Sequence, residues 1–318
     1  MSLIIASQFD AAFNQELAQH PSRPVIVSAA PDAPWTAAND ADVLLAAPTP
    51  AWLARPAPRP DVWPGRLQWV YCGSAGVDFY PEWLLDAPLV TCGRGVASDE
   101  IAEYVIAAIF AQAKGLDAAT IHARGDWRQR SLGQVSGTTI GIVGLGAIGS
   151  AVARRGIALG AHVIAVRRSG PETQLGAGLA GVELAGSMAE LATRAHHIVL
   201  ALPATAETRR LVDAGFLSRV RPDAHLINVA RGSVVDHDAL LLALDEDHLA
   251  FATLDVTDPE PLPEGHRLYT HPKVRLTPHI ASNFQRVRHR LLAKVHDDLS
   301  RYTRGEQPSD VVDKVRGY

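Results

Sequence analysis

The stretch TIGIVGLGAIG, residues 139–149, decides the fold of this chain. Its first five residues, a threonine followed by the apolar run IGIV, are typical of a buried parallel strand. Gly144 permits a tight turn, Gly146 lets the backbone approach a ligand closely, and Gly149 permits close packing of a helix on the strand. A helix is expected directly afterwards, over residues 147–159. A strand, a glycine turn and a helix in this order indicate a dinucleotide site; the alternative is a turn with a purely structural role.

The start of this helix is the part that would hold the pyrophosphate of a dinucleotide. Free backbone N–H groups point out of a helix N-terminus, and the helix dipole favours a negative charge there. We therefore expect five neighbouring residues to contact the coenzyme: Gly144, Gly146, Ala147, Ile148 and Gly149.

The end of the next apolar run bears on the choice of coenzyme. Arg167 and Arg168 stand there, and Arg167 lies eighteen residues after Gly149. A site selective for NAD usually places an acidic residue near this position to bind the ribose hydroxyls. Arginine instead offers planar donors that match the oxygens of a 2′-phosphate, which an acidic side chain would repel. The two arginines favour NADP over NAD, although a pair of solvated arginines is compatible with either coenzyme.

Short apolar runs alternate with helical or loop segments along nearly the whole chain. They lie at residues 3–6, 25–28, 43–46, 67–72 and 89–92, and again at 139–143, 162–166, 198–202, 225–229, 250–255 and 274–277. Helices are expected between most of the later runs, at residues 147–159, 188–195, 214–219 and 237–244. Such alternation predicts an α/β fold with doubly wound parallel sheets.

The chain length and two long helical segments predict two domains. Apolar residues recur at helical spacing between about residues 98 and 123, which predicts one long helix with Ser98 as its N-cap. A last helix, over about residues 283–304, would carry the chain back to the first domain. We expect a dinucleotide-binding Rossmann domain, residues 96–283, inserted into a smaller flavodoxin-like domain of residues 1–95 and 284–318.

Composition and charge exclude several kinds of partner. The 318 residues include 30 Lys and Arg against 34 Asp and Glu, and this net charge of −4 argues against nucleic acid or an anionic membrane as a partner. With 47% hydrophobic and 20% charged residues, the chain can bury a large core. Cys72 and Cys92 form neither a disulfide framework nor a metal-binding spacing, and the N-terminus does not resemble a signal peptide. We expect a cytoplasmic protein without a metal site.

Several further blocks resemble those of a known family. They are NVARG at residues 228–232, LDVTDPEPL at 254–262 and TPHIAS at 277–282, with CGSAGVD at 72–78, the segment 95–103 and GEQP at 305–308. In order and spacing these blocks resemble the D-isomer-specific 2-hydroxyacid dehydrogenases over nearly the whole chain. Within that family, the glyoxylate and hydroxypyruvate reductases are the most similar.

The resemblance implies a catalytic triad of Arg231, Glu260 and His279, and reduction of a keto acid needs these residue types. His279 can protonate the alkoxide that hydride addition creates, because imidazole exchanges protons near neutral pH. Glu260 would bind the other ring nitrogen and fix its tautomer. Arg231 can hold the carboxylate and keto oxygens in a fork. An ordinary loop or surface role is the alternative for each residue, most of all for Glu260, which stands between two prolines.

The resemblance also implies further contacts. Backbone N–H groups of Ala75 and Gly76 would bind the substrate carboxylate together with Arg231. Asp255, at a strand end, is a candidate to bind the nicotinamide carboxamide, with a strand-end cap as its alternative. The remaining coenzyme contacts that the family implies are Pro203, Thr208, Val229 and Ala230, with Arg231 and His279 shared with the catalytic set.

The chain departs from the family pattern at a few positions. Tyr104 stands where a histidine is common, and Thr257 where an aromatic residue is common. Thr257, Trp52 and Trp63 are expected to reshape the substrate pocket. Trp127 would either reach a neighbouring subunit, as its counterpart does in some relatives, or lie buried in the core.

We therefore expect an oxidoreductase that reduces a small 2-keto acid, such as glyoxylate or hydroxypyruvate, to the D-2-hydroxy acid with NADPH or NADH in a cleft between the domains. The family implies a homodimer. One alternative is a formate-type dehydrogenase of the same fold, which Glu260 disfavours because those relatives carry Gln there. The other is a non-enzymatic co-repressor that senses dinucleotides, which the complete triad disfavours.

Overall fold

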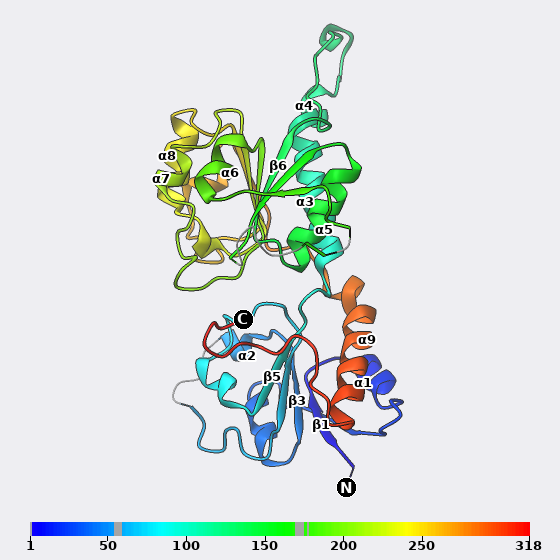
Figure 1. Cartoon of the computed structure of the whole chain (residues 1–318). Coiled ribbons are helices and arrows are strands. Elements are labelled where there is room, and N and C mark those ends of the chain that lie inside the picture. The colour runs from blue at the N-terminus through cyan, green and yellow to red at the C-terminus, as the bar shows by residue number, and fades with distance from the viewer. Residues whose placement is uncertain (1, 54–58, 169–174, 177) are drawn as a thin grey trace. The chain divides into compact units, whose positions relative to one another are not determined.

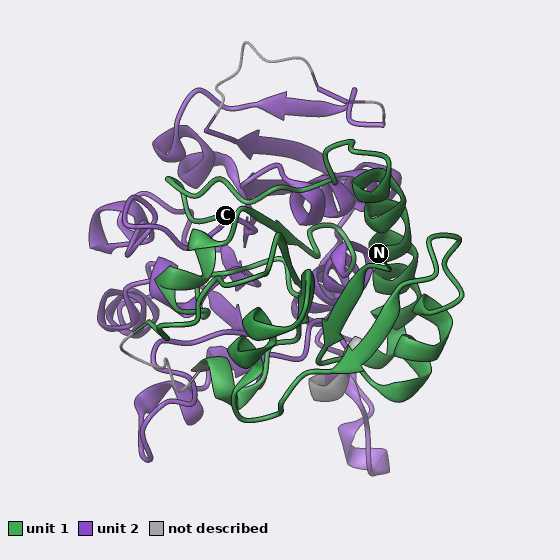
Figure 2. Ribbon diagram, turned by 90° about the horizontal axis from the view of Figure 1, so that it is seen from below, with its two compact units in different colours: residues 1–96, 284–318 green, residues 97–283 purple. Residues whose placement is uncertain are grey.

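The computed structural model describes residues 2–53, 59–168, 175–176 and 178–318. The chain divides into two compact units (Figure 1, Figure 2). Unit 1 comprises residues 1–96 and 284–318, and unit 2 comprises residues 97–283. Each unit contains a parallel sheet of its own, so each is described separately.

Unit 1 is built on a parallel sheet of five strands in the order β2-β1-β3-β4-β5, which is the order of flavodoxin-like folds. Its strands are β1 (Ile4–Ser7), β2 (Val25–Ser28), β3 (Val43–Ala46), β4 (Trp69–Cys72) and β5 (Leu89–Cys92). Its helices are α1 (Ala11–Leu17), α2 (Pro50–Leu53) and α9 (Phe284–Thr303), with 3-10 turns at Pro34–Asn39 and Glu82–Asp86. Helix α9 packs beside α1, where the guanidinium of Arg288 contacts Glu16 at 2.9 Å.

An aromatic cluster forms part of the core of unit 1. Trp52 and Trp63 are buried in it, and the rings of Trp83 and Tyr80 lie 5.0 Å from Trp63 and 5.4 Å from Trp52, respectively. The indole N–H of Trp52 donates to Gln8 Oε1 at 2.7 Å. Aromatic packing and hydrophobic burial hold both side chains inside the unit. The expectation that Trp52 and Trp63 reshape a substrate pocket stays a prediction.

Unit 2 is built on a parallel sheet of seven strands in the order β12-β11-β10-β9-β6-β7-β8. The strands are β6 (Thr139–Val143), β7 (His162–Val166), β8 (Val182–Leu184), β9 (His197–Leu200), β10 (His225–Asn228), β11 (Phe251–Leu254) and β12 (Val274–Leu276). The helices are α3 (Ser98–Lys114), α4 (Leu116–Ala119), α5 (Ala147–Ala158), α6 (Met188–Arg194), α7 (Ala214–Leu217) and α8 (His237–Asp245), with 3-10 turns at Arg124–Asp126, Gly232–Val234 and Arg267–Tyr269. The order reverses between β6 and β9, as in Rossmann sheets.

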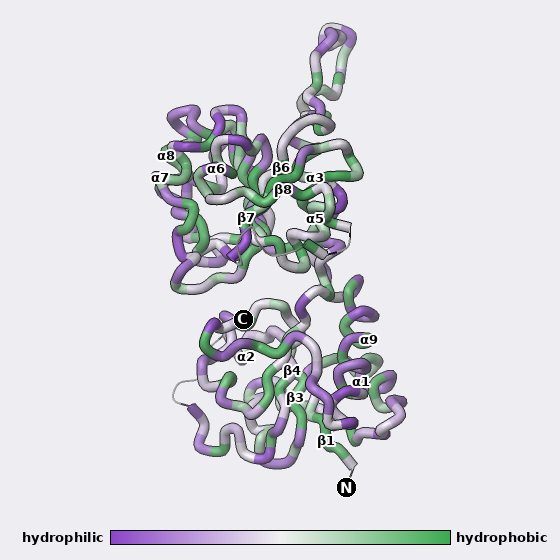
Figure 3. Tube along the Cα trace, viewed as in Figure 1, coloured by the Kyte–Doolittle hydropathy of each residue, from purple (hydrophilic) through white to green (hydrophobic). Residues whose placement is uncertain are grey.

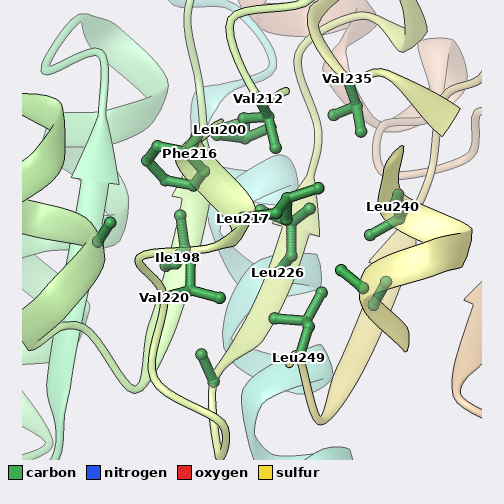
Figure 4. Packing of buried hydrophobic residues seen from close by; sticks show 14 of the residues in the cluster. Ile198, Leu200, Val212, Phe216, Leu217, Val220, Leu226, Val235, Leu240 and Leu249 are labelled. Atoms are coloured by element: carbon green, nitrogen blue, oxygen red, sulfur yellow. The ribbon is translucent and has the colours of Figure 1, made fainter. Parts of the chain in front are cut away.

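Alternate residues of the unit 2 strands enter two separate cores. Ile198 and Leu226 pack with helices α6, α7 and α8, and Figure 4 shows these side chains converging with those of Phe216 and Leu240. Val199 and its neighbours on the opposite face pack with helices α3 and α5. Figure 3 shows the hydrophobic residues along the strands, which explains why the runs read as continuously apolar. Both faces of the sheet are therefore covered, and the predicted doubly wound α/β fold is confirmed.

Two expectations about helix α3 were wrong. The helix begins at Ser98 and follows Ala97, so Ser98 is not its N-cap; the Ser98 side chain is buried, and Asp99 stands in the first turn near the positive end of the helix dipole. The helix ends at Lys114 rather than near residue 123, because Gly115 adopts a left-handed conformation with φ of 50°. After α4, the chain extends away from the rest of unit 2 (Figure 1).

Candidate active site

The predicted catalytic residues all follow neighbouring strands of the unit 2 sheet. Arg231 comes after β10, Glu260 after β11 and His279 after β12, and these three strands are adjacent. Gly144 and Arg167 follow β6 and β7 at the same edge, because every strand pair in the sheet is parallel. The carboxyl edge of a doubly wound sheet is where such folds bind ligands. The fold therefore brings the predicted coenzyme and catalytic residues to one edge of unit 2.

A direct hydrogen bond joins Glu260 and His279. Glu260 Oε1 lies 2.8 Å from His279 Nδ1, and both side chains are partly exposed, at 39% and 48%. A carboxylate can only accept, so Nδ1 carries the hydrogen in this pair. The other ring nitrogen, Nε2, faces away from Glu260. The pair can thus present Nε2 to a reacting group while the carboxylate supports a positive charge on the ring.

Asp255 lies beneath the loop that carries His279. It is only 2% exposed, and its carboxylate accepts three hydrogen bonds: from the Thr277 hydroxyl at 2.7 Å, the Ile280 N–H at 2.8 Å and the Ala281 N–H at 2.9 Å. Its main-chain oxygen also accepts from the His279 N–H at 2.8 Å. Asp255 therefore caps this loop, and a contact to the nicotinamide carboxamide stays a prediction.

The loop that carries Arg231 is held by Asn228 and Gly232. The buried Asn228 amide donates to the Arg231 carbonyl at 2.9 Å and accepts from the Ala230 N–H at 3.0 Å. The Arg231 Nη1 donates to the Ala230 carbonyl at 2.9 Å. A Cβ atom on Gly232 would stand 1.9 Å from the Thr257 carbonyl carbon, so only glycine allows this loop to pack against the loop that leads to Glu260.

The glycine turn has the geometry that a pyrophosphate requires. Gly144 has φ of 96°, a conformation open to glycine, and the space beside the Cα of Gly146 holds no atom of the described residues within 4 Å. Gly149 packs closely on this turn, since a Cβ there would meet the Gly144 carbonyl oxygen at 2.1 Å. Helix α5 then begins at Ala147 without a capping side chain from the described residues. Free N–H groups beside open space fit a bound dinucleotide.

The other predicted coenzyme residues lie on the same edge with different exposure. Arg167 is partly exposed and Arg168 exposed, directly after β7. Thr208 closes its own loop through a hydrogen bond from its hydroxyl to the Pro203 carbonyl at 2.8 Å. The side chains of Val229 and Ala230 are buried, so these two residues can offer only backbone groups to a ligand.

Ala75 and Gly76 lie in unit 1, in the turn that follows β4. Ala75 is exposed, and the Ser74 hydroxyl donates to the Gly76 carbonyl at 2.7 Å, which fixes the turn. Contact of these backbone N–H groups with a substrate carboxylate stays a prediction.

Two residues that shape the site carried no role in the sequence-based interpretation. Asn228 ends β10, and its side chain donates a hydrogen bond to the Arg231 carbonyl. Thr277 follows β12, and its hydroxyl donates to the Asp255 carboxylate. The available signal was a polar residue at the end of an apolar run. That pattern marks a strand end, but it does not tell which partner the side chain binds.

No cluster of three or more His, Cys, Asp or Glu side chains suited to a metal ion occurs among the residues that the structure describes. None of the helices in that part of the chain has the length and apolar character needed to span a bilayer.

Comparisons with known proteins agree with this architecture. Residues 106–281 match the family model of the D-isomer specific 2-hydroxyacid dehydrogenase, NAD binding domain. The glyoxylate/hydroxypyruvate reductase A of Serratia proteamaculans is 31% identical over 263 residues, which cover 80% of this chain and 82% of that protein. The glyoxylate reductase of Korarchaeum cryptofilum is 34% identical over 235 residues, covering 71% and 69%.

A solved structure from the same family is similar to this chain over its whole length. The D-isomer specific 2-hydroxyacid dehydrogenase from Xanthobacter autotrophicus Py2, in complex with NADPH and MES, superposes with a TM-score of 0.80 at 27% identity, covering 100% of this chain and 99% of that one. The fold and the carboxyl-edge site thus define an NAD(P)-dependent oxidoreductase. The chain belongs to the D-isomer specific 2-hydroxyacid dehydrogenase family, whose reaction is the reduction of keto acids by NAD(P)H or its reverse.

Proposed function

We propose that the protein reduces a small 2-keto acid, of the size of glyoxylate or hydroxypyruvate, to the D-2-hydroxy acid with NADPH. The observation that carries this proposal is the 2.8 Å contact between Glu260 and His279 at the ends of strands next to the one that carries Arg231. The names of the relatives from Serratia and Korarchaeum support glyoxylate and hydroxypyruvate as substrates.

His279 is the acid and base in this proposal. Bound reduced nicotinamide supplies a hydride to the keto carbon, and the oxygen of that carbonyl then needs a proton. His279 gives this proton from Nε2, because Nδ1 is held by Glu260. Glu260 keeps the ring in the required tautomer and stabilises its protonated form before the transfer. In the reverse direction the same nitrogen accepts the hydroxyl proton.

Arg231 orients the keto acid and stabilises charge. Its guanidinium offers several N–H donors in a fixed plane, which match a carboxylate and a neighbouring keto oxygen. Negative charge grows on the keto oxygen as the hydride arrives, so a nearby cation lowers the barrier. The contacts of Asn228 and Gly232 support this role, because they fix the backbone from which Arg231 extends.

Arg167 and Arg168 are proposed to select NADPH over NADH. Both follow β7, at the place where the adenosine ribose lies in Rossmann sheets. A 2′-phosphate carries about −1.5 to −2 charges near neutral pH, and guanidinium groups bind its oxygens in pairs. Replacement of Arg167 by Asp is expected to reverse the preference.

We also propose that the protein is a homodimer. Helix α4 and the segment after it extend from unit 2 and expose large apolar side chains: Leu116 at 63%, Ile121 at 42%, Trp127 at 80% and Leu132 at 46%. The alternative of a buried Trp127 was wrong, since its indole is mostly exposed in this chain. Exposed apolar residues on a projecting segment support burial against a second copy.

Cytoplasmic location is proposed on the free thiols of Cys72 and Cys92, which face each other on adjacent strands without a disulfide.

Steady-state assays of NADPH and NADH oxidation with glyoxylate, hydroxypyruvate and bulkier 2-keto acids test the proposal. We expect turnover with the small acids, a higher kcat/KM for NADPH, and a D-configured product from substrates that give a chiral alcohol. Coenzyme binding without turnover on any keto acid would contradict the proposed activity. Arg167→Asp should lower kcat/KM for NADPH, whereas Arg219→Asp, in the loop before β10, should leave the coenzyme preference unchanged.

A further inference from the structure

A chain of hydrogen bonds runs from helix α3 to the loop that carries His279. The Tyr104 hydroxyl lies 2.6 Å from Thr277 Oγ1, and the Thr277 hydroxyl donates to Asp255 Oδ1 at 2.7 Å. We propose that Tyr104 is a positioning residue: through Thr277 and Asp255, it holds the His279 loop in its reactive conformation. The effect on turnover rests on the proposed role of His279, whereas the effect on the loop does not.

The direction of the hydrogen bonds follows from the number of hydrogens. A carboxylate accepts and does not donate, so Asp255 must receive the single hydroxyl hydrogen of Thr277. Thr277 Oγ1 then has only lone pairs left for Tyr104. Tyr104 is therefore the donor in the 2.6 Å contact. Burial raises the pKa of the Tyr104 phenol above its usual value near 10, so this hydroxyl keeps its proton in neutral solution.

The His279 loop needs such support because its backbone is strained. His279 has φ of 54°, in the left-handed region that residues other than glycine rarely adopt. Such a conformation persists only where the surrounding structure holds it. Here Asp255 accepts from three consecutive backbone N–H groups, those of His279, Ile280 and Ala281.

The hydroxyl of Tyr104 can be separated from its packing role. The ring packs against the core between the sheet and helices α3 and α5, where phenylalanine would keep its contacts. Loss of the hydroxyl leaves Thr277 Oγ1 without its donor and frees that side chain to turn away from Asp255. Asp255 then holds the loop with fewer restraints. The expected result is a loop that opens more often and a His279 ring that is less often in line with the keto oxygen.

Amide hydrogen exchange tests whether Tyr104 holds the His279 loop, and this measurement requires no turnover. In Tyr104→Phe and Thr277→Val, the amides of Ile280 and Ala281 should exchange about tenfold faster than in the unmodified protein. Thr277→Ser keeps the hydroxyl and should restore slow exchange. Tyr302→Phe, which removes a partly buried hydroxyl in unit 1, serves as the matched control and should leave these amides unchanged. Unchanged exchange in Tyr104→Phe overturns the proposal.

Steady-state kinetics test whether Tyr104, by holding this loop, positions His279 for catalysis. Tyr104→Phe should lower kcat about tenfold with little change in KM for the keto acid, because a misplaced group slows chemistry more than binding. The primary deuterium isotope effect on kcat should rise as hydride transfer becomes rate-limiting. If Tyr104 acts through Thr277, the double variant Tyr104→Phe/Thr277→Val should be no slower than Thr277→Val alone. Additive losses, or an unchanged kcat in Tyr104→Phe, overturn the proposal. If the unmodified protein reduces no keto acid, the proposed function fails, and exchange still decides whether Tyr104 holds the loop.

Discussion

The role of each side chain in this site is inferred from the hydrogen bonds that it can donate or accept. Glu260 Oε1 lies 2.8 Å from Nδ1 of His279, and the proposed mechanism uses the other ring nitrogen, Nε2, toward the substrate. Asn228 uses both ends of its amide on the loop before Arg231, at 2.9 and 3.0 Å. The proposed reactive groups are thus partly exposed, while Asn228 and Asp255, which hold their loops, are buried. Substitutions of the two kinds should have different effects, the first on chemistry and the second on the geometry of the loops.

Replacement of His279 by Ala removes the proposed proton donor. We expect kcat to fall by about 10²–10⁴, the usual contribution of a positioned acid or base. NADPH binding, followed by its fluorescence, should change little. His162→Ala, at the exposed start of β7, is the matched control and should keep normal turnover. Undiminished kcat in His279→Ala would remove this residue from the mechanism.

Replacement of Arg231 by Lys keeps the charge but removes the planar fork. We expect kcat/KM for the keto acid to fall about 10- to 100-fold, because a point charge replaces paired, charge-assisted hydrogen bonds. Arg219→Lys makes the same substitution on an exposed loop and should leave kcat/KM unchanged. Equal kcat/KM for Arg231→Lys and the unmodified enzyme would show that Arg231 does not bind the substrate in a fork.

The sequence is informative about reactive residues and much less so about their supports. Arg231 and His279 each stand two residues after an apolar run and inside a family block, so both signals agree. Glu260 stands inside a family block but further along its loop, between two prolines, so only the family signal points to it. Thr277 and Asn228 carry only the signal of a strand end. Their partners, Asp255 and the Arg231 carbonyl, are brought to them by strand order and loop packing, which no local pattern in the sequence encodes.

At the scale of elements, the loops after β10, β11 and β12 form a row because the strands are parallel and adjacent. Their spacing depends on close backbone contact. Gly232 packs directly on the Thr257–Asp258 peptide, so the Arg231 loop cannot move toward solvent without losing that contact. Gly146, by contrast, faces open space on the coenzyme side of the same edge. Glycine suits these two positions for different physical reasons, close packing at Gly232 and open space for a ligand at Gly146.

Gly232→Ala and Gly146→Ala form a contrasting pair. Gly232→Ala forces a Cβ into the Thr257 carbonyl, and we expect about 1–3 kcal/mol of destabilisation together with lost turnover. Gly146→Ala should leave Tm nearly unchanged, because no described atom lies within 4 Å of the added Cβ, but it should weaken coenzyme binding. Thermal unfolding with and without NADPH measures both effects. The reverse pattern would show that the two loops are packed differently.

Element boundaries were predicted well where a residue that favours the end of an element flanks the apolar run, and poorly elsewhere. The runs at β3, β5, β6 and β7 begin and end as expected, and each has a polar, proline or glycine residue next to at least one end: Asp42 before β3, Pro88 before β5, Gly144 after β6 and Arg167 after β7. Helix α3 is shorter than expected because the apolar residues continue past Gly115, whereas the left-handed backbone of Gly115 ends the helix. Strand β8 (Val182–Leu184) was missed because three residues at a sheet edge are too few to show a period.

At the scale of the whole molecule, the two units have separate cores, and unit 2 contains a buried pair of histidines. His197 and His225 start the adjacent strands β9 and β10, with their ring centroids 5.7 Å apart. Burial lowers the pKa of His197 to about 4 and lowers that of His225 as well. His225 Nε2 lies 2.8 Å from the Thr253 hydroxyl. Both rings are thus held in their neutral form in the folded protein.

Stability of unit 2 should therefore fall in mild acid. The unfolded chain binds a proton at His197 below about pH 6.5, whereas the folded chain does so only near pH 4. Stability from this group is fully present above pH 6.5 and decreases as pH falls toward 4, by on the order of 3 kcal/mol. Tm measured across this range should drop less steeply in His197→Phe than in His162→Phe, an exposed control. Parallel curves would contradict the assignment.

The most direct test of the proposed chemistry is a crystal structure of the protein with NADPH and oxamate, an unreactive isostere of a 2-keto acid. We expect the oxamate carbonyl oxygen within about 2.6–3.2 Å of His279 Nε2, its carboxylate on the Arg231 guanidinium, and its carbonyl carbon facing the nicotinamide. Oxamate bound away from His279 and Arg231 beside a correctly placed nicotinamide would contradict the assignment of these residues to catalysis.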